Sequence, residues 1–279
     1  MRDQDCVRFL QSCLPSLGLR WAGYRKVRGT VCKRIGRRLR ELGLADLAAY
    51  GRRLDRSPEE AARLDAFCRI PISRFYRDRA VFDALGQPLL ADLAERAAMR
   101  GDREVHCWSA GCASGEEVYT LRLLWDLAPP TRHRDRRLTI LGTDADEVML
   151  KRAAAACYAR GSFKDAPADW PERAFTADDD RLCLRPEFRR DIVFRREDIR
   201  ERQPDGPFDL VLCRNLAFTY FTGDLQRRTL AAIERRLWPG GLLVLGAHER
   251  LPDGAAAFVR ARATLPIWRK PGKEEGGPG

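Results

Sequence analysis

The stretch "CWSAGCASGEEVYTL", residues 107–121, joins an apolar strand pattern to a helical pattern through a turn of small residues. Small residues let the backbone approach a ligand closely, and glycine tolerates the positive φ of a tight turn. In an open α/β sheet, ligands bind beyond the carboxyl ends of the strands. This turn is therefore predicted to form one wall of a cofactor site at the end of its strand.

Acidic residues near the turn narrow the kind of cofactor. Glu116 and Glu117 suit a helix N-terminus, where negative side chains are stabilised, but they would repel a pyrophosphate. The turn also lacks the lysine of a P-loop. The next strand ends in "GTDAD", which places Asp144 where an acidic side chain can take ribose hydroxyls. Together these features favour a nucleoside with a cationic centre, S-adenosylmethionine, over NAD or a nucleoside triphosphate.

Length and charge set the broad class of protein. The chain has 279 residues, 44% of them apolar, and a net charge of +11. This length suits one large domain, or a large domain with a small companion. The basic balance favours an acidic partner such as nucleic acid, acidic lipid or a carboxylate-rich protein surface. No apolar run reaches the roughly 18 residues of a membrane span, and residues 1–20 carry charges, so we expect a cytoplasmic protein without an integral membrane segment.

The nine cysteines lie singly, without a CxxC pair, and the three histidines are scattered. Isolated cysteines commonly serve as small core residues. Neither a metal site nor a disulfide framework is predicted.

Residues 1–68 show only helical patterns, which predicts a small N-terminal helical domain. Within it, residues 24–44 have a dense basic face and an apolar stripe formed by Val27, Val31, Ile35, Leu39 and Leu42. The basic face is either the solvated surface of a packed helix or an electrostatic docking surface. A later helix is expected to begin with Ser57 as its cap and Pro58 in its first position.

From about residue 85, strand patterns alternate with helical ones, which predicts a mostly parallel sheet covered on both faces. Strands are expected at "EVHCWSA", "LTILGTD", "DIVFRRED", "FDLVLCRN", "GLLVLGAH" and "ATLPIWRK". Helices are expected at 115–128, 146–157, 223–237 and 252–262. Pro266 lacks an amide donor, so it should lie near an edge or a bulge.

Three other segments complete the predicted organisation. Residues 69–84 connect the helical domain to a sheet domain at 85–270. Residues 160–195 have the pattern of a small antiparallel insertion into that domain. The tail at 271–279, which is rich in glycine and charge, is expected to be disordered.

Five blocks of the sequence resemble, in order and spacing, the CheR-type chemotaxis receptor methyltransferases. The blocks are "FCRIPISRFYRDRAVFDAL", "CWSAGCASGEEVYTL", "ILGTDADEVMLKRAAAACY", "FDLVLCRNLAFTYF" and "WPGGLLVLGAHERL". The similarity runs from about residue 25 to residue 270. It implies a Rossmann-like class I methyltransferase sheet with a small helical domain and an antiparallel β insertion.

The resemblance also implies an activity and a partner. Enzymes of this family transfer a methyl group from S-adenosylmethionine to glutamate side chains of chemoreceptors, and S-adenosylhomocysteine is the product. The implied partner is an acidic protein surface, such as a chemoreceptor cytoplasmic domain, docked on the basic helix at 24–44 of a monomeric enzyme. No metal is implied.

The connecting segment at 69–84 is implied to close over the cofactor. In "SRFYR", Ser73 and Arg77 match cofactor contacts, and Arg77 suits the methionine carboxylate because a guanidinium binds carboxylates bidentately. Pro71 stands where the family usually has an asparagine. Phe75 and Tyr76 can be either core residues or cofactor walls.

The turn and the next two strand ends carry the other implied cofactor contacts. Either Glu116 or Glu117 would reach the cofactor's amino group. Asp144 is expected to bind the ribose, whereas Asp146 is the alternative and is more readily a helix cap. The residues that would shape the turn and meet the adenine are Ala110, Gly111, Ser114 and Gly115, and then Asp198 and Ile199.

The block "CRNLAFTYF" is implied to lie beside the transferring methyl group. Asn215 and Leu216 match cofactor-contacting positions, and Tyr220 matches the active-site tyrosine. The chain carries one more residue than usual between Asn215 and Tyr220, so the loop must differ. His248 and Glu249 match a further block, where they can equally be strand-end packing.

These residues imply catalysis by positioning. A glutamate carboxylate is ionised at neutral pH and needs no general base, so Asn215 and Tyr220 would orient the acceptor. Two alternatives remain open: a methyltransferase of the same fold that acts on a small molecule or nucleic acid, and a non-catalytic protein that keeps the cofactor site and uses the basic helix for interaction.

Overall fold

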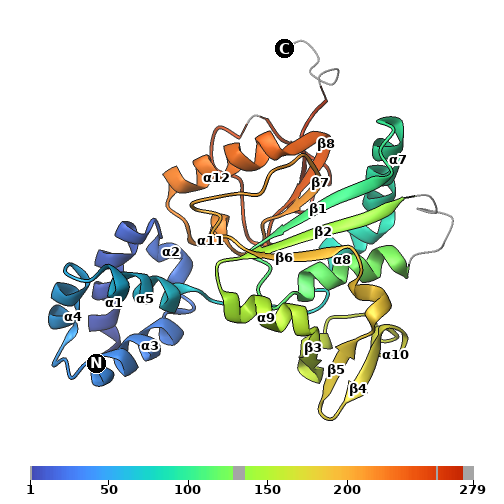
Figure 1. The fold of residues 1–279 in the computed structure, drawn as a ribbon. Helices are drawn as coiled ribbons and strands as arrows, with labels where there is room; N and C mark the ends of the chain where they lie inside the picture. The colour runs from blue at the N-terminus through green and yellow to red at the C-terminus, as the bar shows by residue number, and fades with distance from the viewer. Residues whose placement is uncertain (1, 128–135, 256, 273–279) are drawn as a thin grey trace. The chain divides into compact units, whose positions relative to one another are not determined.

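The structure is a computed structural model that describes residues 2–127, 136–255 and 257–272. The chain forms two compact units (Figure 1). We call the first the helical unit, which consists of Met1–Pro71 and Thr219–Gln226. The second, the sheet unit, consists of Ile72–Phe218 and Arg227–Gly279. Among the described residues, no helix combines the length and the apolar character that crossing a bilayer requires.

The described residues 2–68 of the helical unit form helices joined by short connections, as predicted. They are α1 (Asp3–Cys13), a 3-10 turn (Leu14–Leu17), α2 (Trp21–Tyr24), α3 (Arg28–Glu41), α4 (Leu47–Leu54) and α5 (Pro58–Cys68). The basic segment at 24–44 is one main helix, α3, which begins only at Arg28. Ser57 accepts a hydrogen bond from the Glu60 amide at the start of α5, and Pro58 takes the first position, so both predictions are confirmed.

The sheet unit is built around seven strands in the order β6-β2-β1-β7-β8-β10-β9. Strands β6, β2, β1, β7 and β8 are parallel to one another, and β10 is antiparallel to its neighbours β8 and β9. The predicted mostly parallel sheet is therefore confirmed. The strands are β1 (Glu104–Ala110), β2 (Arg137–Asp144), β6 (Ile192–Arg196), β7 (Phe208–Leu212), β8 (Leu237–Val244), β9 (Val259–Arg260) and β10 (Ile267–Arg269).

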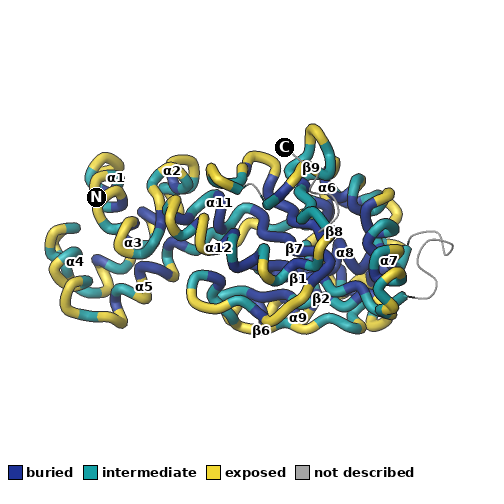
Figure 2. The backbone as a smooth tube through the Cα atoms, turned by 90° about the horizontal axis from the view of Figure 1, so that it is seen from above, coloured by how far each residue is buried: buried dark blue, intermediate teal, exposed yellow. Residues whose placement is uncertain are grey.

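Helices cover both faces of this sheet. In Figure 1, α8 (Glu116–Asp126) and α9 (Glu147–Ala155) lie below the sheet, and α12 (Gly223–Arg236) lies above it. Helix α7 (Leu90–Met99) packs on β1 and β7. Because both faces are covered, the central strands are apolar throughout, and all five residues of β7 are buried (Figure 2).

The strand order identifies the edge of the sheet at which ligands are expected to bind, next to the carboxyl ends of β1 and β7, which we call the ligand edge. The chain passes from β1 through α8 to β2 on one side, whereas β7 pairs with β1 on the other side. The order therefore reverses between β1 and β7, and ligands of such sheets bind outside the carboxyl ends of the strands at this point. The turn after Ala110 lies at this edge.

The predicted antiparallel insertion is present and begins slightly earlier than expected. Its strands are β3 (Cys157–Ala159), β4 (Phe175–Asp178) and β5 (Arg181–Leu184), in the order β3-β5-β4. The short helix α10 (Trp170–Ala174) precedes β4. The core of the insertion is aromatic. Phe75 is stacked on Phe163 at a centroid distance of 4.7 Å and is set edge-on to Tyr158.

The helix predicted at 252–262 is wrong for the described residues of that stretch. They form turns and strand β9 instead; residue 256 lies outside the described residues. Gly254, with a φ of 84°, has a left-handed conformation inside the predicted range, which a continuous helix does not allow. Pro266 immediately precedes β10, so it removes no hydrogen bond from that strand. The predicted disordered tail lies outside the described residues from 273 onward.

The expected absence of disulfides is wrong. Cys6 is bonded to Cys32, and Cys157 is bonded to Cys183. Each pair is 26 residues apart in sequence, so only the packing of α1 on α3 and the pairing of β3 with β5 brings the sulfur atoms together. Asp178 lies 3.7 Å from the Cys183 sulfur, but the bond between the cysteines consumes the thiolates that a metal would require.

Candidate functional site

The glycine turn after β1 is tied to the end of β2. The amides of Gly111 and Cys112 both donate to the Thr143 carbonyl, at 2.8 and 3.0 Å. Gly111 has a φ of 73° and Gly115 a φ of 89°, so the positive φ expected of this turn is confirmed at both glycines.

Both glycines also permit close approaches that a side chain would block. A Cβ atom on Gly111 would lie 2.5 Å from Leu216 Cδ2, and one on Gly115 would lie 2.9 Å from the Ala153 Cβ atom. The first approach brings the turn to the end of β7, and the second brings α8 close to α9. The structure therefore brings the predicted residues Ala110, Gly111 and Leu216 to one place at the ligand edge.

Asp144 holds the turn through its carboxylate. One oxygen accepts from the Ala113 amide at 2.9 Å, and the other accepts from the Asp146 amide at 2.8 Å. Asp146 caps α9 by accepting from the Val148 and Met149 amides, which confirms its interpretation as a helix cap.

The two glutamates at the start of α8 have different partners. Glu116 is buried, and one of its oxygens accepts from the Ser114 hydroxyl at 2.8 Å. Glu117 accepts from the Ser109 hydroxyl with one oxygen and from Arg214 with the other, both at 2.8 Å. The charge of Glu117 is therefore balanced inside the protein, whereas this contact of Glu116 is to a neutral group.

Arg214 is the residue that sequence reasoning missed. Its side chain is buried beyond the end of β7, with one terminal nitrogen on Glu117. The other donates to the Asp78 carboxylate at 2.8 Å and to the Arg77 carbonyl at 2.7 Å. Its guanidinium carbon lies 4.8 Å from the centre of the Phe82 ring. The available signal was a charged residue directly after a continuous apolar strand.

Asn215 follows Arg214 in a left-handed conformation with a φ of 54°. Its amide donates to Glu249 at 2.7 Å, and the same oxygen accepts from the Gly246 amide at 2.7 Å. Glu249 is therefore strand-end packing that joins the loops after β7 and β8, which is one of the two interpretations given above. His248 is exposed beside it.

The residues of the connecting segment differ in burial. Phe75 and Tyr76 are both buried: Phe75 lies in the aromatic core of the insertion, and the Tyr76 hydroxyl donates to Asp83 at 2.8 Å. Ser73 and Arg77 are half-buried, and Arg77 donates to the Ile72 carbonyl at 2.7 Å.

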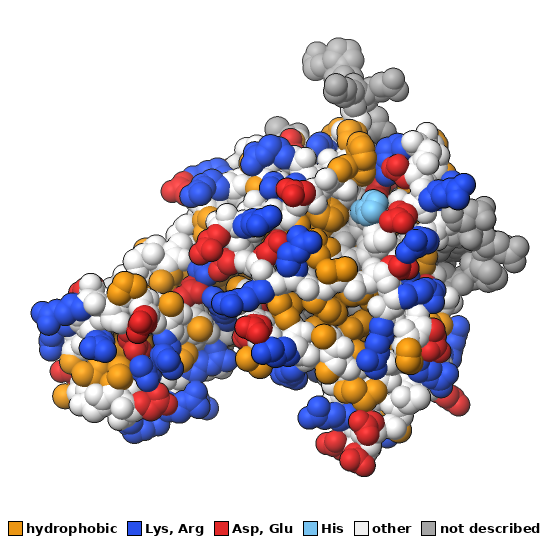
Figure 3. All heavy atoms as spheres, viewed as in Figure 1, with side chains coloured by type: hydrophobic (Ala, Val, Ile, Leu, Met, Phe, Trp, Pro, Cys, Tyr) orange, Lys and Arg blue, Asp and Glu red, His pale blue; other side chains and the backbone are white. Residues whose placement is uncertain are grey.

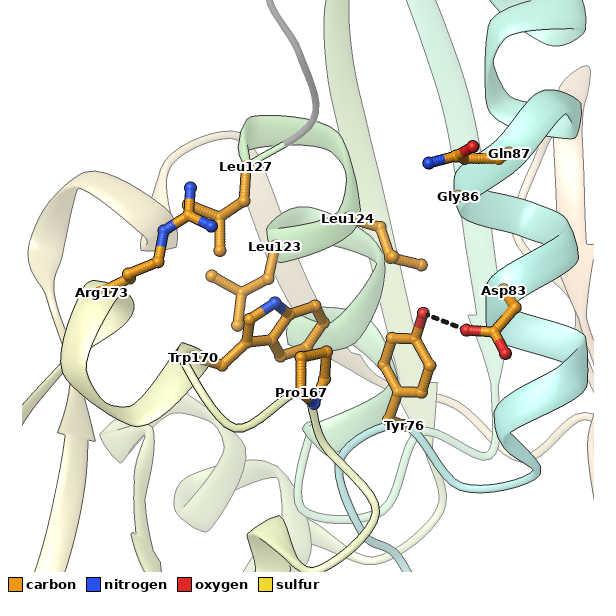
Figure 4. A pocket seen from close by; sticks show the side chains of 10 residues that line it. All are labelled: Tyr76, Asp83, Gly86, Gln87, Leu123, Leu124, Leu127, Pro167, Trp170 and Arg173. Carbon is orange, nitrogen blue, oxygen red and sulfur yellow. Dashed lines mark hydrogen bonds between the residues drawn. The ribbon is translucent and has the colours of Figure 1, made fainter.

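A cavity of about 440 Å³ lies beside Tyr76 (Figure 4). Leu123, Leu124 and Leu127, from the carboxyl end of α8, line it together with Trp170. The glycine turn lies at the opposite end of this helix, which at 11 residues is about 16 Å long. Of the residues considered for the cofactor site, Tyr76 lines this cavity, whereas the residues of the glycine turn do not.

One of the two predicted adenine contacts has an ion-pair partner that the sequence did not predict. Ile199 is buried, as an apolar wall requires. Asp198 forms an ion pair with Arg200, with an oxygen-to-nitrogen distance of 2.6 Å. An adenine amine would therefore share this carboxylate with a guanidinium.

Tyr220 belongs to the helical unit and is described with it. Its ring lies 5.0 Å from the Tyr24 ring, and its carbonyl accepts from the Arg20 amide at 2.8 Å. Asn215 belongs to the sheet unit, so the joint action of these two residues stays a prediction.

Half of the basic face of α3 is used inside the helical unit. Arg38 pairs with Glu60 at 2.7 Å, and Arg34 donates to the carbonyls of Phe67 and Arg69. The Arg38 guanidinium holds the pKa of Glu60 below its ordinary value of 4.5. On the face drawn in Figure 3, basic side chains are spread over this unit, with acidic and apolar ones between them.

Three basic residues of α3 form an exposed stripe. Lys33, Arg37 and Arg40 are four and three residues apart, so they lie on one side of the helix. Arg37 is 3.7 Å from Glu41, and both side chains are exposed. We call these three residues the α3 stripe.

A family model described as "CheR methyltransferase, SAM binding domain" matches residues 72–265. The chain belongs to the CheR methyltransferase family. The resemblance, the cofactor and the enzyme class inferred from sequence are thereby confirmed: this CheR methyltransferase uses S-adenosylmethionine. The donor set at the ligand edge fits that cofactor, because the Asp144 carboxylate ends β2 and the buried Glu116 carboxylate begins α8.

Relatives with at least 30% identity match most of the chain. A "Chemotaxis protein methyltransferase" of Listeria monocytogenes is 31% identical over 256 residues, 91% of this chain and 92% of that protein. One of the same name from Escherichia coli is 30% identical over 247 residues, 85% of this chain and 82% of that protein. An uncharacterized 104.1 kDa protein of Rhodobacter capsulatus is 35% identical over 241 residues, which cover 86% of this chain but 25% of that longer protein.

Proposed function

We propose that this CheR methyltransferase methylates glutamate side chains on an acidic protein surface, with a chemoreceptor cytoplasmic domain as the candidate substrate. The printed names of the Listeria and Escherichia relatives support this choice. We further propose that it acts as a monomer in the cytoplasm. In this proposal residues 1–68 form the docking domain, 69–84 cover the cofactor, and 85–270 form the methyltransferase domain.

The observation that carries the glutamate acceptor is the state of the groups around the end of β7. Asp78 and Glu117 both pair with Arg214, and Glu249 accepts two backbone amides. Each of these carboxylates therefore already holds a structural contact within the sheet unit. Cys213 is buried, and burial raises the pKa of its thiol above the ordinary value. This environment suits an acceptor that is already ionised, as glutamate is at neutral pH.

In this proposal, each residue of the ligand edge binds a different group of the cofactor. The bound sulfonium supplies the electrophilic methyl group. Asp144 would accept from the ribose hydroxyls. Glu116 would take the ammonium group, since the charge of Glu117 is balanced by Arg214. Arg77 would bind the methionine carboxylate.

The remaining roles follow from the resemblance and complete the proposed site. Ser73 would lie over the cofactor, and Asp198 would accept from the adenine amine beside Ile199. Asn215 and Tyr220 would orient the acceptor carboxylate in line with the methyl group. Because no covalent intermediate is needed, most of the rate would come from this positioning.

Methyl transfer to a purified receptor cytoplasmic fragment tests the acceptor. With tritium-labelled methyl groups on the cofactor, we expect labelled protein that releases volatile methanol in alkali, as a methyl ester does. His248 is exposed near the end of β8, so His248→Gln removes the imidazole that could act as a base. We expect this variant to keep its turnover. Alkali-stable label, or a large loss in His248→Gln, would indicate an alcohol, phenol or amine acceptor instead.

A charge reversal tests docking on the helical unit. Changing the α3 stripe to glutamate should raise the KM for the receptor fragment at low salt, because opposite charges steer the encounter. The control is Arg52→Glu on α4, an exposed residue of the same unit. An equal effect of the control, scaled by charge, would show that only net charge matters.

A further inference from the structure

We infer that Arg214 is a positioning residue that presents Arg77 to the cofactor. This inference deepens the proposed function and rests on the proposed contact between Arg77 and the methionine carboxylate. Arg214 reaches three separate parts of the sheet unit at once: the connecting segment, the first turn of α8 and the end of β7. Its side chain is buried and both terminal nitrogens are occupied by these bonds, whereas its Nε has no hydrogen-bond partner among the residues that the structure describes.

The backbone around Arg77 requires external support. The residues on either side of it, Tyr76 and Asp78, both have left-handed conformations, with φ values of 59° and 64°. Non-glycine residues persist there only when their surroundings hold them in place. Two such residues around one arginine make its direction depend on the contacts of this short segment.

Arg214 supplies the support on the carboxyl side. One of its nitrogens donates to the Arg77 carbonyl at 2.7 Å and to the Asp78 carboxylate at 2.8 Å. On the amino side, the Tyr76 amide donates to the Thr120 hydroxyl of α8 at 3.1 Å. The backbone of Arg77 is thus held from both sides, while its side chain makes its hydrogen bond to the Ile72 carbonyl.

The same guanidinium also sets the electrostatics of the turn. Its second nitrogen pairs with Glu117, which follows the glycine turn directly. The planar fork of arginine allows these bonds in fixed directions, and the ring of Phe82 supports its face. Lysine, with a single nitrogen, cannot bridge the two sites in this way. The position of Arg77 and the charge of the turn are therefore coupled through one residue.

The test compares cofactor binding in Arg214→Met with that in Arg122→Met. Arg122 is the matched control, because it is also buried and pairs with Asp126 at the other end of α8. We expect both variants to lose stability, but only Arg214→Met to raise the Kd for S-adenosylhomocysteine, by at least tenfold. Arg214→Lys should recover little of the loss. An equal effect of both methionine variants on Kd would overturn the inference.

Hydrogen exchange over residues 72–84 provides a readout that a general loss of stability does not produce. In the unmodified protein, saturating S-adenosylhomocysteine should protect this segment. In Arg214→Met we expect the cofactor, at saturation, to protect the glycine turn but not residues 72–84. Protection of both segments would contradict the positioning role.

The variant Arg77→Met separates this inference from the proposed cofactor contact. If Arg77→Met binds the cofactor normally, the proposed contact fails, and the inference fails with it. If Arg77→Met weakens binding while Arg214→Met does not, the contact stands and only the positioning role is overturned. None of these measurements uses a methyl acceptor, so they are independent of the substrate.

Discussion

The variant Gly111→Ala, compared with a control, should separate two effects: the loss of stability caused by an alanine in a left-handed conformation, and the loss of cofactor affinity caused by a displaced wall of the cofactor site. At a φ of 73° an alanine costs roughly 1–2 kcal/mol of stability relative to glycine. Its Cβ would also lie 2.5 Å from Leu216 Cδ2, whereas ordinary contacts begin at 3.4 Å. Either the turn or Leu216 must therefore move by about 0.9 Å. Leu216 is flexible at its end, so we expect this movement to affect binding more than stability.

Gly101 provides the control. It has a φ of 83°, and a Cβ atom there would meet nothing within 4 Å. Gly101→Ala therefore carries the backbone cost alone. In urea unfolding, both variants should lose a similar 1–2 kcal/mol or so. In isothermal titration, only Gly111→Ala should bind S-adenosylmethionine and S-adenosylhomocysteine more weakly, by about tenfold or more, which is about 1.4 kcal/mol.

The double variant Gly111→Ala/Leu216→Ala completes the measurement. Because shortening Leu216 removes the clash, the double variant should bind better than the two separate losses predict. Normal affinity of Gly111→Ala, at a stability equal to that of Gly101→Ala, would refute the reasoning. The turn would then not form a wall of the cofactor site.

Three further predictions concern stability and the turn. Arg38 lowers the pKa of Glu60, so the ionised carboxylate stabilises the fold fully at pH values above its ordinary pKa of 4.5. This contribution is lost as the pH falls through the lowered pKa of the folded state. Urea unfolding midpoints measured between pH 7 and 3 should therefore show a drop that Glu60→Gln lacks. Reducing the Cys6–Cys32 bond should cost about 3.5 kcal/mol by loop entropy over its separation of 26 residues, and a thiol titration of the unreduced protein should find the five free cysteines. Tyr158→Phe removes a buried bond of 2.7 Å to a carbonyl of the glycine turn, which should cost about 1–2 kcal/mol in urea unfolding and weaken cofactor binding; an unchanged Kd would separate the insertion from the turn.

The sheet could be predicted because its signals are local. A strand buried on both faces is a continuous apolar run, and the "FDLVL" of β7 is buried at every position. The helix at 252–262 failed for the opposite reason. Its alanine-rich composition favours a helix, but the pairing of β9 with β10 and the left-handed Gly254 decide the structure there.

The positions of the acidic residues in the candidate site could be predicted from the sequence, but their hydrogen-bond and ion-pair partners could not. The positions of Asp144 and Glu117 follow from where a strand ends and a helix begins. The partners of Arg214, in contrast, are 97 and 136 residues away in sequence, and no periodicity encodes such a distance. The disulfides were missed for the same reason, since each joins cysteines from elements that meet only in the folded chain.

The net charge of +11 does not show which of the basic residues are exposed and unengaged. Arg34 and Arg38 hold carbonyls and a carboxylate within the helical unit, and Arg214 is buried in the sheet unit. Charges that are paired inside the protein attract a partner weakly, because their fields are largely cancelled by the groups they bind. A docking surface must then be sought among exposed cations arranged on one side of an element, as in the α3 stripe. The salt dependence of receptor binding should therefore follow these few residues and not the net charge of the chain.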